Sequence, residues 1–262
     1  MIYLTFVLRA CDGEAAFIQS IWLGGTFPSG FGSVKEEAIT MEIRTTFHQH
    51  LRDVESDVLI MGNLVVKAID RAIEALKKQD LTLAHQIIAD DAQINKLRFS
   101  IEDKCVELIS TQQPVASDLR LILAALNIII ELERIGDYAE GIAKIVIMIG
   151  DEPPLKPLID IPRMAEITTE MINKSLQSFL NRDVELAMQA VTLDNIVDNL
   201  NDQIFRELLT FMMVNPKTIN SATRLIWVAH NLERAADRAT NISERVVFTV
   251  TGKMEEIGAS KY

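Results

Sequence analysis

Apolar residues recur at intervals of three and four positions along most of this chain. Between residues 47 and 76 the spacing is nearly uninterrupted, which is typical of an amphipathic helix and not of a strand. After the first forty residues, proline occurs only at Pro114, within 153–162 and at Pro216. Proline interrupts a helix and disfavours the helical conformation of the residue before it, so these places mark the joints. We therefore expect an all-α protein made of long helices.

Six helices follow from this pattern, with short joints between them. Asp, Ser, Thr and Asn at the start of a helix can accept hydrogen bonds from its free N–H groups. The candidate capping residues are Asp80, Ser117 or Asp118, Asp183, and Thr218 or Asn220. The expected helices cover about 47–77, 81–110, 118–149, 161–179, 184–214 and 220–250. A helix of about thirty residues is roughly 45 Å long, so these rods must pack side by side.

The helical pattern occurs twice. A displacement of 103 positions aligns residues 80–97 with 183–200, and one of 100 positions aligns 132–142 with 232–242. The displacement changes between the second and third helices of each copy, where a loop tolerates a difference in length. We therefore predict a tandem repeat of two three-helix bundles with six long antiparallel helices. The expected organisation is an N-terminal extension at 1–40, a first repeat at 41–150, a second repeat at 151–252 and a tail at 253–262.

Pairs of acidic residues lie beside the apolar stripes of these helices. Two carboxylates one helical turn apart repel each other, so a repeated pair needs a cation or a basic side chain nearby. The recurring sets are Asp91 with Asn95, Glu133 with Asp137, Asp194 with Asp198, and Glu233 with Asp237. Oxygen-only clusters suit cations such as magnesium, manganese, iron or zinc. The predicted metal ligands are therefore the carboxylates of Asp91, Glu133, Asp137, Asp194, Asp198, Glu233 and Asp237.

A second interpretation treats these acids as ordinary solvated side chains. Arg134, Arg234 and Arg238 lie close enough in sequence to pair with them, and such surface pairs stabilise a fold very little. Because the acidic pairs recur at equivalent positions, we favour the metal-binding interpretation. His230 lies one turn before Glu233, so it could bind the same cation or pair with a neighbour such as Glu233.

Composition excludes several functional classes. The chain has 26 Lys and Arg against 37 Asp and Glu, a net charge of −11, and it lacks the basic clusters with which proteins bind nucleic acids. Its two cysteines, Cys11 and Cys105, lie far apart, which argues against a disulfide framework and a thiolate metal site. It contains no Glu-x-x-His pair, phosphate-binding loop or nucleophile elbow, so we do not expect an enzyme. Without a bilayer-length apolar run or a recognisable signal peptide, we expect a cytosolic protein.

The acidic motif reads ERIGD at 133–137 and LERAAD at 232–237, where it is followed by NISE at 241–244. Together with the segments 117–120 and 47–51, it resembles the repeated signature of the PhoU family of phosphate-signalling proteins. The resemblance implies an all-α protein of two three-helix bundles. It also implies that the E(D)xxxD residues bind multinuclear clusters of iron or other metals.

The same resemblance implies a biological role. Proteins of that family repress the phosphate-starvation regulon and modulate a phosphate ABC transporter. The implied partners are the transporter ATPase and a sensor histidine kinase, with contact to the membrane only through protein partners, and the implied assembly is a homodimer. Our leading hypothesis is therefore a non-enzymatic, metal-binding signalling adaptor. The alternatives are a helical scaffold without bound metal and a carboxylate-bridged metalloenzyme.

Residues 1–40 lie outside this resemblance, which covers about 41–252. They contain five of the eleven glycines and show no sustained apolar periodicity. We interpret them as a disordered extension or, preferably, as the product of an upstream start codon that is not used. A membrane-contacting role for 17–27 is the alternative, although that segment has no basic residue to meet anionic lipid.

The two predicted metal sites differ in their ligands. Asn95 stands in the first repeat where the second has Asp198, and Gly141 stands where the second has Asn241. Because a carboxylate binds a hard cation more tightly than a neutral amide does, we expect the first-repeat site to be the weaker one.

Overall fold

The computed structural model describes residues 32–253, and in this range it contains the six predicted helices. Their bounds are Gly32–Lys78 for α1, Leu81–Gln112 for α2, Ala116–Ile149 for α3, Asp160–Asn181 for α4, Val184–Val214 for α5 and Ile219–Thr251 for α6. A single 3₁₀ turn, η1, spans Pro216–Thr218. Within the same range the chain has no strand, and none of its helices is long and apolar enough to cross a membrane. The all-α prediction is confirmed.

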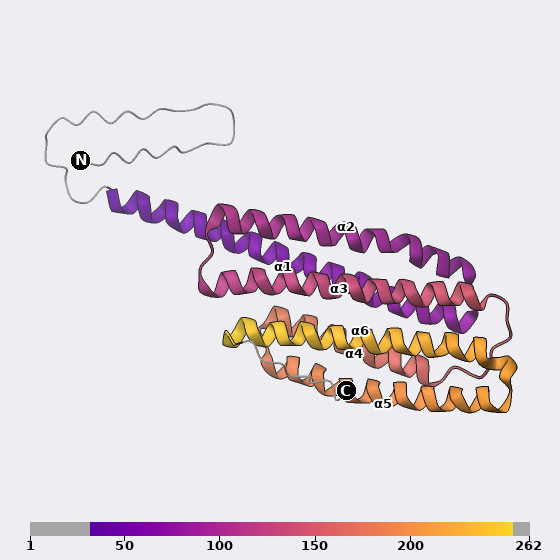
Figure 1. The fold of residues 1–262 in the computed structure, drawn as a ribbon. Helices are drawn as coiled ribbons and strands as arrows, with labels where there is room; N and C mark the ends of the chain where they lie inside the picture. Colours follow the sequence, from indigo (N-terminus) through magenta and orange to yellow (C-terminus); the bar gives the residue numbers. More distant parts are fainter. Residues whose placement is uncertain (1–31, 254–262) are drawn as a thin grey trace, which may run out of the picture. The chain divides into compact units, whose positions relative to one another are not determined.

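The packing of the helices matches the predicted tandem repeat. In the compact unit that begins at Arg44, α1, α2 and α3 form one bundle and α4, α5 and α6 form the other (Figure 1). The bundles meet where α3 packs along α6. These two helices are antiparallel, because Arg120 near the start of α3 lies beside Gly252 at the end of α6. Each bundle therefore presents its third helix to the other bundle.

The apolar stripes of α3 and α6 are buried. All twelve positions that the helical period places on these stripes have side chains that are at most 1% exposed. They are Ile128, Leu132, Ile135, Ala139, Ile142 and Val146 in α3, and Val228, Leu232, Ala235, Ala239, Ile242 and Val246 in α6. They belong to one apolar core that runs through both repeats. Burial of these stripes orients both helices, and so determines where the neighbouring acidic side chains lie.

Two of the predicted helix starts are confirmed with their caps. The Asp80 carboxylate accepts a hydrogen bond of 2.9 Å from the Leu83 N–H at the start of α2. The Asp183 carboxylate accepts one of 3.0 Å from the Leu186 N–H at the start of α5. The repeat is therefore exact at this local level, because each copy uses an aspartate to satisfy a free N–H group.

The start of α3 differs from the prediction. Its N-cap is Val115, which makes no side-chain cap, and the expected caps Ser117 and Asp118 lie inside the first turn. The turn is closed by the backbone, since the Asp118 N–H donates to the Val115 carbonyl over 3.0 Å. Pro114 restricts the residue before it and not those after it, so the helix can begin almost directly behind the proline.

The start of α6 is preceded by a turn that the apolar period does not indicate. Thr218 is the N-cap, as one of our alternatives had it, but its side chain does not cap α6. Its hydroxyl instead donates to the Phe211 carbonyl over 3.1 Å. The reason is that η1 lies directly before α6 and ends at Thr218. In this turn the Lys217 N–H donates to the Asn215 side chain, and the Thr218 hydroxyl donates to the Asn215 carbonyl.

Part of the predicted N-terminal extension is helical. We expected residues 1–40 to lie outside the helices, but α1 begins at Gly32, so residues 32–40 are helical. The segment 34–43 contains neither glycine nor proline, and six of its ten residues are Glu, Lys, Ala or Met, which favour a helix. The remaining part of the predicted extension, 1–31, and most of the predicted tail lie outside the described residues.

A close approach of α1 to α4 yields the first prediction. A Cβ atom on Gly62 would lie 2.2 Å from Cδ1 of Leu176, which is itself buried. Since a packed core must shift to accept the added methyl group, we expect Gly62→Ala to lower the free energy of unfolding by about 1 kcal/mol. That change should lower Tm by roughly 2–4 °C in a protein of this size, measured by thermal denaturation.

Gly141→Ala is the matched control for this prediction. A Cβ atom there would make an ordinary contact of 3.4 Å with Oδ1 of Asn231. Replacing a glycine in the middle of a helix should then raise the free energy of unfolding by about 0.5–1 kcal/mol. If both variants were stabilised to the same extent, the close approach of α1 to α4 would be wrong.

Candidate metal centre

The second repeat places its four predicted ligands on two helices that pack against each other. α5 carries Asp194 and Asp198, and it packs along α6, which carries Glu233 and Asp237. Burial, together with the negative charges of the three other carboxylates, raises the pKa of Asp194 to about 7. Carboxylates influence one another in this way only over short distances. The spacing along the sequence and the packing of two helices therefore converge on one acidic cluster.

The other acids of this cluster are perturbed in the same direction. Burial raises the pKa of Glu233, and the negative charge of Asp237 adds to that effect. Burial also raises the pKa of Asp237, while the positive charge of Arg238 opposes the shift. Each carboxylate is thus held among like charges with fewer water molecules than it would have in solution. A bound cation would relieve both effects.

Two carboxylate oxygens of the cluster are buried without a hydrogen-bond partner. They are Oδ1 of Asp194 and Oε2 of Glu233. Nδ1 of His230 lies 3.1 Å from that Glu233 oxygen, within ion-pair distance, but it does not meet hydrogen-bond geometry. A buried oxygen without a partner costs free energy. These oxygens and the carboxylate-only donor set fit a hard or borderline cation.

The first repeat forms a related cluster. α2 supplies Asp91, and α3 supplies Glu133 and Asp137. Burial raises the pKa of Asp91, and the charge of Asp137 adds to it. Asn95 lies one turn from Asp91 and donates a hydrogen bond of 2.7 Å to its carboxylate. The amide therefore satisfies one oxygen of Asp91, a role that the equivalent Asp198 of the second repeat cannot play as a carboxylate.

Glu140 belongs to the first cluster but escaped the sequence analysis. Burial is the main cause of the raised pKa values of Asp91 and Asp137, and the negative charge of Glu140 raises both further. Its counterpart in the second repeat is Thr240, so a comparison of the two copies does not single it out. Glu140 lies three residues after Asp137, and this spacing could have indicated that the two acids are neighbours on one face of the helix.

A close approach of α2 to α3 shapes the first cluster. A Cβ atom on Gly136 would lie 3.1 Å from Cδ1 of Ile94 and 3.4 Å from Oδ1 of Asp91. Gly136 thus lets the Asp91 carboxylate lie close to the backbone of α3. The second repeat has Ala236 at this position.

The two clusters differ in the basic side chains that lie beside their acids. Nη1 of Arg98 lies 3.8 Å from Oε1 of Glu133 in the first repeat, and the equivalent position of the second repeat is Asn201. Glu140 is also engaged, because Nζ of Lys144 lies 2.5 Å from its carboxylate. Part of the negative charge of the first cluster is therefore neutralised by side chains of the same chain.

Arg234 and Arg238 of α6 reach across the seam to α3, whereas Arg134 pairs within α3. Arg238 lies 3.3 Å and Arg134 3.9 Å from the carboxylate of Glu131. Arg234 donates a hydrogen bond of 3.2 Å to the Tyr138 hydroxyl, and its guanidinium lies 5.6 Å from the centre of that ring. The alternative interpretation paired these arginines with the motif acids. Their close contacts are with Glu131 and Tyr138 instead, although the positive charge of each arginine still opposes the raised pKa of a motif acid.

Neither cluster is a closed coordination shell. Among residues 32–253, no three His, Cys, Asp or Glu side chains lie together as the ligands of one metal ion. A cation in either cluster would therefore keep water ligands, as magnesium commonly does. The residues that would hold it are Asp194, Asp198, Glu233 and Asp237 in the second repeat, and Asp91, Glu133 and Asp137 in the first.

Comparison with known proteins agrees with the repeat. The PhoU domain family matches the chain twice, over residues 58–146 and 161–246. A protein of Aquifex aeolicus described as a phosphate-specific transport system accessory protein PhoU homolog is 42% identical over 71% of this chain and 84% of its own length. The Pseudomonas aeruginosa protein of the same description is 35% identical over 84% of this chain and 91% of its own length.

Solved structures show the same fold. The crystal structure of PhoU from Pseudomonas aeruginosa superposes with a TM-score of 0.76 at 36% identity, covering 79% of this chain and all of that one. PhoU from Streptococcus pneumoniae, described as a phosphate transport system regulatory protein, superposes with a TM-score of 0.75 at 28% identity, covering 80% of this chain and 99% of that one. The tandem three-helix architecture and both acidic motifs thus have one explanation: the chain belongs to the PhoU family.

Proposed function

We propose that this protein regulates phosphate transport as an accessory protein of a phosphate-specific transport system. The observation that carries the proposal is the double family match, which covers both repeats, together with relatives described by that role. In this proposal the protein acts in the cytoplasm as a homodimer. It represses the phosphate-starvation regulon and transmits the state of a phosphate ABC transporter, through its ATPase, to a sensor histidine kinase.

We further propose that the two acidic clusters bind iron, manganese, magnesium or zinc ions. The support is the set of perturbed carboxylates in each repeat and the two buried oxygens without partners in the second. A bound cation supplies positive charge that offsets the repulsion between the carboxylates. α5 would supply Asp194 and Asp198 to hold the cation, and α6 would supply Glu233 and Asp237. Metal would thus stabilise the packing of the two helices and would not take part in a reaction.

A deletion strain tests the regulatory proposal. Removing the gene should raise alkaline phosphatase activity and transporter expression in medium with abundant phosphate, because the repressing signal is lost. A plasmid copy of the unaltered chain should restore repression. Unchanged reporter activity in the deletion strain at high phosphate would show that this chain does not repress the regulon.

A further inference from the structure

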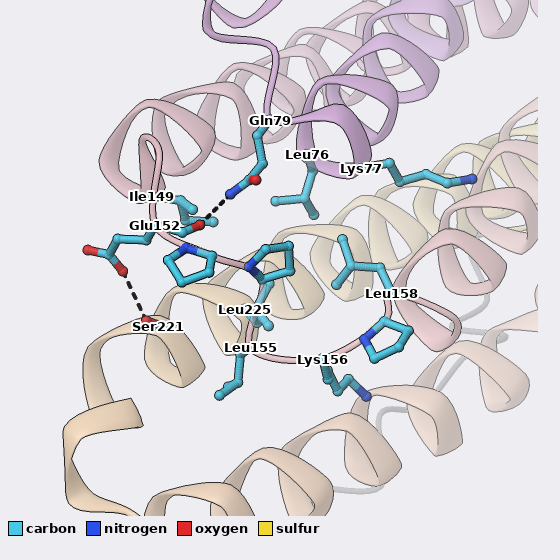
Figure 2. Close-up of a pocket in the computed structure, with 13 residues that line it drawn as sticks. Leu76, Lys77, Gln79, Ile149, Glu152, Leu155, Lys156, Leu158, Ser221 and Leu225 are labelled. Carbon is cyan, nitrogen blue, oxygen red and sulfur yellow. Dashed lines mark hydrogen bonds between the residues drawn. The ribbon is translucent and has the colours of Figure 1, made fainter.

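The segment that connects the two repeats covers a cavity of about 250 Å³ (Figure 2). Its walls come from three sources. Leu76 at the end of α1 and Ile149 at the end of α3 belong to the first repeat, and Leu225 of α6 belongs to the second. The connecting segment adds Leu158 and three prolines. The cavity therefore lies at the joint between the repeats and is lined mainly by apolar side chains.

Three polar residues that line the cavity, Gln79, Glu152 and Ser221, are bonded to one another. Nε2 of Gln79 donates to the Glu152 carbonyl oxygen over 2.6 Å. The Glu152 carboxylate accepts hydrogen bonds from the Ser221 hydroxyl over 3.0 Å and from Arg224 over 2.7 Å. Figure 2 shows two of these contacts as dashed lines at one side of the cavity. They fasten the connecting segment to both repeats.

The wall formed by the connecting segment has little freedom to collapse. Proline holds φ near one value, and Pro153, Pro154 and Pro157 all line the cavity. The side chain of Lys156, in the same segment, is only 8% exposed. Its ammonium group pairs with Glu207 of α5 and lies 3.9 Å from the Asp160 carboxylate. The segment is thus anchored on α5 as well as on α6. A preformed space is the usual property of a small-molecule site.

Sites for small molecules are concave and mostly apolar, as this preformed space is. An apolar cavity of about 150 Å³ accepts benzene. The present cavity is larger, so a fused bicyclic ring system fits its volume better. We propose that it binds a small uncharged aromatic molecule of about the size of indole. Such a molecule would touch Leu76 of one repeat and Leu225 of the other, and so would stabilise the joint between them.

Titration of indole into the full chain tests this proposal. We expect saturable binding by calorimetry and shifts of methyl NMR signals confined to Leu76, Leu158, Leu225 and their neighbours. Because a ligand that binds only the folded state stabilises it, Tm should rise by about 3 °C at a concentration of ten times Kd. The experiment is independent of metal, so the result should be the same in the presence of a chelator.

Variants that fill the cavity separate specific from general binding. Leu225→Trp places an indole ring in the space itself, and Leu158→Phe fills part of it from the other wall. Each should weaken indole binding at least tenfold. Leu209→Trp on the exposed surface of α5 is the matched control and should leave binding unchanged. Leu158→Phe decides the matter if Leu225→Trp fails to fold. Absence of saturable binding, or equal binding by all three variants, would overturn the proposal.

Discussion

Glu233→Gln/Asp237→Asn should abolish the tighter class of bound divalent cations, with a loss of affinity of at least a hundredfold. Glu133→Gln/Asp137→Asn should remove only the weaker class. The expectation rests on the proposal that both clusters bind metal. Each double substitution exchanges two anionic ligands for neutral amides of nearly the same shape, so a change in cation affinity would not come from altered packing.

Structural differences between the repeats lead us to expect the second to be the stronger site. It has four carboxylates with Asn241 close by in sequence, and two of its buried oxygens have no hydrogen-bond partner. In the first repeat Asn95 already donates to Asp91, and Arg98 lies beside Glu133. Glu140 adds a negative charge there, but Lys144 neutralises much of it. A cation must displace these built-in partners in the first repeat, whereas in the second it meets two buried oxygens without a hydrogen-bond partner.

The measurement combines elemental analysis of dialysed protein with a titration of manganese into each variant. The number of ions and their affinities should be compared at pH 8 and pH 5. Binding should release protons and weaken toward pH 5, because a carboxylate with a pKa of about 7, as at Asp194, must lose its proton first. Retention of the tight class by the Glu233→Gln/Asp237→Asn variant would contradict the assignment. Equal metal content in all three proteins would favour the helical scaffold instead.

Asp194→Asn should stabilise the metal-free protein while it weakens cation binding. In chelator-treated protein at pH 8, we expect the free energy of unfolding to rise by about 2 kcal/mol. A shift from 3.8 to about 7 corresponds to roughly 4 kcal/mol, and we halve that figure because Asp194 is partly exposed and solvent screens its charge. An asparagine of similar shape avoids the repulsion by the neighbouring carboxylates and the cost of burying a charge.

The sign of the pH dependence follows from proton binding. The pKa of Asp194 is higher in the folded state than in the unfolded state, so between about pH 4 and pH 7 only the folded state keeps this proton. The free energy of unfolding of the unaltered protein should therefore fall as pH rises through this window. The Asp194→Asn variant lacks this proton, so its advantage should be small near pH 4 and should reach its full value by pH 8.

Urea denaturation at a series of pH values, with and without manganese, measures both effects. Asp198→Asn is a useful comparison, because it removes one of the charges that raise the pKa of Asp194. It should stabilise the metal-free protein less than Asp194→Asn does. A destabilised Asp194→Asn variant at pH 8 would show that this carboxylate has a structural role, and would count against an evolved cation site.

Spacing along the chain was sufficient to identify the helices and the repeat. Apolar residues every three or four positions can only be buried together on one face of a helix, so Ile128 and Val228 were placed in the core correctly. Asp80 and Asp183 were recognised as caps because the cap bonds a group three residues away. Interactions of this kind depend on neighbours in sequence, and a single sequence contains them.

The sequence-based prediction was less accurate where backbone geometry sets the start of a helix, or where contacts between distant residues form the acidic cluster. Pro114 allowed α3 to begin before any polar cap, and η1 was inserted ahead of α6. Glu140 and Arg98 were overlooked because neither has a counterpart of the same kind in the other repeat. Their importance arises only when α2 lies against α3, close enough for Gly136 to meet Asp91.

The amino-acid sequence by itself determined which residues form helices, that the three-helix unit occurs twice, and which carboxylates recur at equivalent positions. Each of these follows from local periodicity and from comparison of the chain with itself. Only the tertiary structure decided which acids share a cluster, which arginines turn away toward Glu131 and Tyr138, and where the joint between the repeats leaves a cavity. The physical reason is that burial, charge interaction and cavity volume depend on distances between helices, and helical period does not specify those distances.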